Sequence, residues 1–141
     1  MLLRDSTSTR AMAGLAQLAA DRGDRAGAIR WLEQVHRQRP RDVKAASQLA
    51  ELYWQVGDHQ RALTLKARNV ELRPWLAQGY YDLGSVLLQV GSAERALPHL
   101  LRAIAIAPDS VTYYVRAAAA HEALGQLEQA EDLRQRAGRL P

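Results

Sequence analysis

Four histidines are the side chains of this sequence best suited to holding a metal or moving a proton near neutral pH. They are His36, His59, His99 and His121, and no two of them lie three to five residues apart. The chain has no cysteine, so neither a Cys–His metal site nor a thiolate nucleophile can form. The sequence therefore predicts no metal site.

Motifs for other kinds of catalysis are missing too. The glycines occur singly and build no phosphate-binding loop, and Gly91, Ser92 and Ala93 mark a junction between helices rather than a strained turn around a nucleophile. Glu131 and Asp132 are adjacent on a polar helix, where neighbouring side chains cannot face one substrate. We expect no catalytic residue, no cofactor and no enzymatic activity in this chain.

Residues that mark helix ends and close helix packing recur at a fixed interval along the sequence. Glycine, alanine and proline each return every 34 residues, without an insertion. The three series are Gly23, Gly57, Gly91 and Gly125; Ala28, Ala62, Ala96 and Ala130; and Pro40, Pro74 and Pro108. Interleaved markers of one period indicate an internal repeat.

Each repeat is predicted to contain two helices. Ala46, Leu49, Ala50 and Tyr53 follow helical spacing, and Gly57 ends that helix because glycine tolerates a left-handed cap. Aspartate or serine follows the glycine in three repeats and is placed to cap the next helix, as Asp24, Asp58 and Ser92. The recurring alanine is expected where the two helices cross most closely.

These residues resemble the tetratricopeptide repeat, a helix–turn–helix unit of 34 residues. The resemblance implies an all-α, right-handed superhelical solenoid of four repeats, in one domain over residues 9–141. The repeats are 9–42, 43–76, 77–110 and 111–141. Residues 1–8 match no repeat and are expected to be frayed or to remain from a preceding unit.

In this family the first helix of each repeat lines a concave groove, and the resemblance implies that a partner peptide lies there. The matching positions mix amides, charges and two large aromatic rings. The candidate residues are Gln17, Lys44, Gln48, Glu51, Trp54, Gln78, Tyr81, Asp82, Ser85 and Arg116. One subclass binds a terminal carboxylate with basic residues, but the matching positions here lack that charge. A carboxylate clamp is therefore not expected.

Composition limits the remaining classes of partner. The net charge of +4 is spread along the chain, so the sequence favours a protein or peptide partner over nucleic acid. No apolar stretch is long enough to span a membrane, and MLLRDSTST lacks the apolar core of a signal peptide. A cytoplasmic location is favoured for the chain as given, and its richness in Arg and Ala suggests a bacterial genome.

The sequence thus predicts a non-catalytic scaffold for protein–protein interaction. Two alternatives stay open: a self-associating repeat module, or the substrate-recruiting arm of a larger enzyme. Self-association is suggested by the first helix, where no preceding repeat covers Met12, Leu15 and Leu18.

Overall fold

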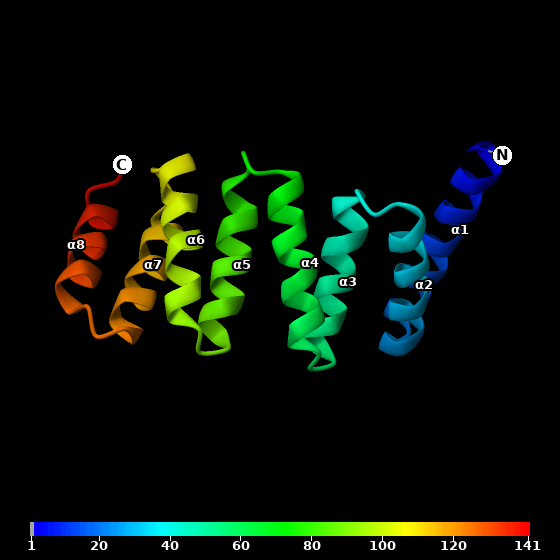
Figure 1. The fold of residues 1–141 in the computed structure, drawn as a ribbon, viewed down its shortest axis with the longest axis horizontal. Coiled ribbons are helices and arrows are strands. Elements are labelled where there is room, and N and C mark those ends of the chain that lie inside the picture. Colours follow the sequence, from blue (N-terminus) through cyan, green and yellow to red (C-terminus); the bar gives the residue numbers. More distant parts are fainter. Residues whose placement is uncertain (1) are drawn as a thin grey trace. The chain divides into compact units, whose positions relative to one another are not determined.

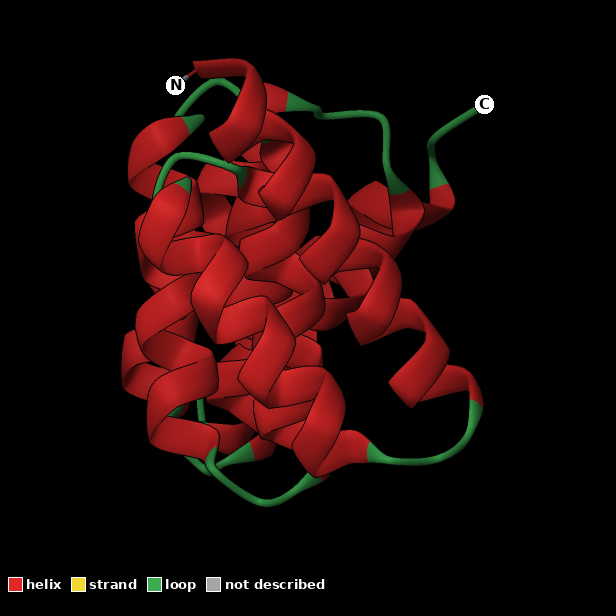
Figure 2. Cartoon of the chain, turned by 90° about the vertical axis from the view of Figure 1, so that its right-hand side faces the viewer, coloured by secondary structure: helices red, strands yellow, loops and turns green. Residues whose placement is uncertain are grey.

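The structure is a computed structural model that describes residues 2–141, with side chains from residue 8 onward. Its helices follow one another along the chain as hairpins, and the described residues contain no strand (Figures 1 and 2). The helices are α1 Leu2–Asp21, α2 Arg25–Gln38, α3 Val43–Gln55, α4 His59–Leu72, α5 Ala77–Gln89, α6 Ala93–Ile106, α7 Val111–Ala123 and α8 Leu127–Gly138. The prediction of an all-α chain is confirmed.

The turn inside each hairpin depends on glycine. Gly23, Gly57, Gly91 and Gly125 have φ angles of 77°, 85°, 81° and 74°, and no other residue of the described part of the chain has a positive φ. In this region a Cβ atom would crowd the following carbonyl oxygen, which glycine avoids. The 34-residue series of glycines therefore marks the points where the chain reverses.

Replacing Gly57 with alanine should lower the free energy of unfolding by about 1–2 kcal/mol, the cost of the left-handed conformation for an L-residue. Chemical denaturation followed by circular dichroism measures this. Gly14 provides the control, because it lies within α1 and an added Cβ would meet nothing within 4 Å. Gly14→Ala should be neutral or stabilising by up to about 1 kcal/mol, and equal effects at the two sites would contradict this account of the turn.

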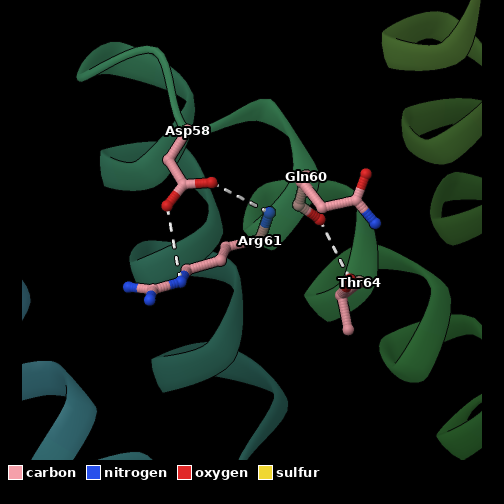
Figure 3. A network of polar contacts seen from close by, with 4 residues as sticks. All are labelled: Asp58, Gln60, Arg61 and Thr64. Carbon is pink, nitrogen blue, oxygen red and sulfur yellow. Dashed lines mark hydrogen bonds and ion pairs between the residues drawn. The ribbon is translucent and has the colours of Figure 1, made fainter.

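Aspartate side chains begin three of the helices. In each case the aspartate Oδ1 accepts a hydrogen bond from a backbone N–H three residues further on. The pairs are Asp24 with Gly27 at 2.9 Å, Asp42 with Ala45 at 3.1 Å and Asp58 with Arg61 at 3.2 Å. Asp58 also pairs with the Arg61 side chain at 3.4 Å, and the Thr64 hydroxyl donates to the Gln60 carbonyl at 2.9 Å (Figure 3). Ser92 is the N-cap residue of α6, as its position predicted, but its side chain makes no cap hydrogen bond.

Small residues let the two helices of each hairpin approach closely. Ala28, Ala62, Ala96 and Ala130 are all fully buried. In the third repeat, a Cβ atom added to Gly84 would lie 2.7 Å from Leu100 Cγ and 3.2 Å from the Ala96 carbonyl oxygen. Fully buried Leu49, Leu87 and Leu100 fill the space around these contacts. The full burial of the four alanines agrees with the packing reason predicted for them, and the position of the closest helix crossing stays a prediction.

The chain forms two compact units, Met1–Leu72 and Arg73–Pro141. In unit 1, successive helices from α1 to α4 pack against each other, and in unit 2 the same holds from α5 to α8, with a further contact between α5 and α7. The division into one domain over 9–141 remains a prediction. Helix α1 begins at Leu2, so residues 2–8, expected to be frayed or to remain from a preceding unit, are helical, and Met1 lies outside the described residues.

Candidate functional site

Unit 1 contains a cleft of about 810 Å³ between α1 and α3. Four of the five groove residues predicted for this unit line it, namely Gln17, Lys44, Gln48 and Glu51. Buried apolar side chains of α1, α2 and α3 form its floor: Ala16, Leu32, Val35 and Ala45. The candidate residues of α1 and α3, the first helices of the two repeats in unit 1, thus line the same cleft.

The polar groups around the cleft differ in how far they are engaged. Gln17 donates to Asp21 at 2.9 Å, and Glu51 accepts from Gln55 at 3.3 Å. Lys44 and Gln48 make no side-chain hydrogen bond or ion pair within the described part of unit 1. Their amide and ammonium groups can therefore bind another molecule without first breaking an internal contact.

Trp54 does not line this cleft. Its indole packs against the core of unit 1 and stacks on the His59 ring, with 4.0 Å between the ring centroids. Met12 is also buried, packed with Val35 and Ala45, whereas Leu15 and Leu18 are exposed. The expectation that Met12 lies uncovered is wrong, because α2 and α3 of the same unit cover it.

In unit 2, the predicted groove residues form a network between α5 and α7. Gln78 donates to Asp82 at 2.8 Å and accepts from the Tyr113 hydroxyl at 3.3 Å. The rings of Tyr81 and Tyr113 stack with centroids 5.0 Å apart. Arg116 lies over Tyr81, with its Cζ 5.9 Å from the ring centroid and a long 3.5 Å contact from Nη2 to the hydroxyl.

Tyr113 is the member of this network that the sequence analysis missed. It lies on α7 three residues before the candidate Arg116, and the pair Tyr113–Tyr114 was the only signal available. Burial raises the pKa of the Tyr113 phenol, and the nearby Asp82 charge and Tyr81 add to the shift. The phenol thus stays a neutral hydrogen-bond donor to Gln78.

A second hollow, of about 330 Å³, adjoins this network in unit 2. It is lined by Tyr81, Val111, Thr112, Val115, Arg116 and Ala119. Ser85, the remaining predicted groove residue, is not part of it, and its hydroxyl oxygen is buried without a hydrogen-bond partner.

None of the histidines lines either hollow, and His121 contacts the Gln126 side chain at 2.7 Å. His99 stacks on Tyr80 with centroids 6.3 Å apart, and burial, followed by the charge of Arg95, lowers the pKa of its imidazole. Among the described side chains, no three His, Asp or Glu residues are grouped to hold a metal. No helix in residues 2–141 combines the length and apolar character needed to cross a membrane.

Sequence models of the tetratricopeptide repeat match residues 9–34 and 43–65 and, separately, 77–110, together more than half of the chain. The matches begin at the first residues of three predicted repeats. No curated protein sequence matches this chain.

Solved structures resemble this chain over most of its length. MamA from Desulfovibrio magneticus RS-1 is 28% identical, with a TM-score of 0.80 over 92% of this chain and 73% of that chain. A crystal structure of MamA at 23% identity has a TM-score of 0.81 over 96% and 80%, and supports the fold alone.

A mutant O-GlcNAc transferase of Thermobaculum terrenum is 30% identical, with a TM-score of 0.63 over 84% of this chain but only 23% of the transferase. The fold class of the present chain is an all-α repeat solenoid, as predicted. Its repeats, hairpins and structural neighbours agree, and the chain belongs to the tetratricopeptide repeat family.

Proposed function

We propose that this protein-interaction scaffold is non-catalytic and that the unit 1 cleft binds an extended segment of a partner protein. Repeats of this family support the scaffold role. The observation that carries the proposal is the cleft of about 810 Å³, whose rim holds Lys44 and Gln48 without internal partners. Its volume falls in the range of about 300–1,000 Å³ typical of ligand sites.

The lining favours a peptide backbone over a compact small molecule. Ala13, Gly14 and Ala20 line the α1 side, and such small residues leave room for a main chain to lie along the helix. Gln17 and Gln48 offer amides that can both donate to and accept from peptide groups. Lys44 and Glu51 carry opposite charges in the same cleft, which supports recognition of an internal segment rather than a terminal carboxylate.

Removing the two amides should weaken peptide binding about tenfold or more. Each hydrogen bond contributes roughly 1 kcal/mol net, and about 1.4 kcal/mol corresponds to a factor of ten in affinity. Peptides are first selected from a displayed random library on the wild-type protein. Fluorescence anisotropy of a selected peptide then compares the wild type with Gln17→Ala/Gln48→Ala.

The matched control is Gln34→Ala/Gln60→Ala, which removes the same two groups from exposed positions on α2 and α4. It should bind like the wild type. An equal loss of peptide affinity in both variants would show that the peptide does not bind at the cleft.

Light scattering after size exclusion tests whether a second copy of the chain occupies the cleft instead. A concentration-dependent dimer that Gln17→Ala/Gln48→Ala dissociates would replace the partner segment with self-association. A dimer that persists in this variant would indicate another surface, such as the exposed Leu15 and Leu18 of α1.

A further inference from the structure

The hollow between α5 and α7 in unit 2 joins one cation to an apolar surface. We propose that it binds a partner segment in which a single acidic side chain is flanked by branched aliphatic residues. The carboxylate would meet Arg116, and the aliphatic groups would cover Val111 and Val115. All of its lining residues belong to unit 2 and none of them lines the unit 1 cleft, so it goes beyond the function proposed above.

Arg116 is a cation that pairs with no carboxylate of the described residues. The ion pairs recorded among the described residues are Arg61–Asp58 and Arg134–Glu122, and neither involves it. Its internal contacts are those to Tyr81, whose ring it faces at 5.9 Å. A guanidinium has five N–H donors in a planar fork, so several remain to bind a carboxylate with charge-assisted hydrogen bonds.

Tyr81 and Tyr113 hold this arginine in place. Arg116 is only partly exposed, and the stack of the two tyrosines fixes the ring that it faces. An arginine already ordered against an aromatic ring loses less side-chain entropy on binding than a free surface arginine does. Arg136 also lies over a ring, that of Tyr114 at 5.2 Å, but among these two arginines only Arg116 lines the hollow, so the network favours binding there.

The aliphatic part of the ligand follows from the rest of the lining. Val111 is 48% exposed and Val115 is 53% exposed, one helical turn apart on α7, and Ala119 continues the same face. A free anion would leave these apolar groups in water, whereas aliphatic neighbours of the acidic residue would bury them.

Asp82 limits the number of acidic residues that the site accepts. It follows Tyr81 on α5, and its carboxylate is held by Gln78 within the same network. A run of acidic side chains would bring like charges toward it, which is unfavourable. The ligand is thus one acidic residue among aliphatic ones, and not an acidic tract.

The test uses two pools of fluorescent decapeptides with a fixed Ile-Glu-Val or Ile-Gln-Val core and random Gly, Ser, Ala and Thr around it. The wild-type chain should bind the Glu pool roughly fivefold more tightly than the Gln pool, because only a carboxylate forms charge-assisted bonds with Arg116. Arg116→Gln should abolish this preference. Arg102→Gln, at an exposed position on α6, should keep it.

A measurement on the wild type alone tests the proposal even if the Arg116→Gln variant does not fold. The Arg116 Nε–H resonance should shift on addition of the Glu pool and not on addition of the Gln pool. Val115→Ser should weaken the binding of both pools to the same extent, since both share the aliphatic flanks.

Three results would overturn the proposal. In the first, the wild type shows no preference for the Glu pool, or binds neither pool. In the second, the preference for the Glu pool survives in a folded Arg116→Gln variant. In the third, the preference is lost in Gln17→Ala/Gln48→Ala. The last result would place the preference in unit 1. Conversely, failure of the unit 1 cleft to bind a selected peptide would leave the Arg116 measurements unaffected, so the two proposals fail separately.

Discussion

Replacing Leu100 with alanine should lower the free energy of unfolding by about 2–5 kcal/mol, the range for a fully buried leucine. Leu100 has 0% exposure, and its Cγ lies 2.7 Å from the position that a Cβ on Gly84 would take. Because Gly84 has no side chain that could move into the space, the cavity should stay largely open. Urea denaturation followed by circular dichroism measures the loss.

The next residue of α6 provides the control for this change. Leu101 is 39% exposed, so Leu101→Ala should cost well under half as much as Leu100→Ala. Gly84→Ala should lower the free energy of unfolding of the wild type. In the Leu100→Ala background, the same substitution should lower it less or raise it. Additive effects of the two substitutions would show that Gly84 and Leu100 are not in contact.

Replacing Ala96 with leucine should destabilise the chain by about 1–3 kcal/mol or more, through overpacking. Ala96 has 0% exposure, and its carbonyl oxygen lies 3.2 Å from the position that a Cβ on Gly84 of α5 would take. Three additional carbon atoms at this position must separate the two helices. A lower denaturation midpoint is the expected readout.

Ala105→Leu is the matched control for Ala96→Leu. Ala105 lies on the same helix but is exposed, so its replacement should change stability by about 0.5 kcal/mol or less. If Ala96→Leu were tolerated equally well, the recurring alanine would owe its position to something other than helix packing.

The repeat itself could be predicted because its markers are local. Gly57 must adopt a positive φ and Asp58 accepts the N–H of Arg61 three residues on, so both roles depend on a few neighbouring residues. The same holds for alanine at the crossing point, where only small side chains fit. Even the first residues of the matched repeats, Thr9, Val43 and Ala77, follow from this spacing.

The binding surfaces could be predicted only in part. The family resemblance grouped Lys44, Gln48 and Glu51, and all three line the cleft in the structure. Periodicity cannot show which rings a side chain meets, and Trp54 turned out to pack on His59 while Tyr113 joined Tyr81. These contacts join residues whose side-chain directions depend on several packed helices.

The sequence alone therefore determined the all-α repeat fold, the helix ends and the small residues at each crossing. Backbone sterics and chain-local hydrogen bonds decide those features, and both are written in residue type and spacing. Tertiary structure alone decided which polar groups remain without internal partners. Among the described side chains, Lys44 and Gln48 are left so in unit 1 and Arg116 has no carboxylate partner in unit 2, which depends on how the helices pack and not on residue spacing.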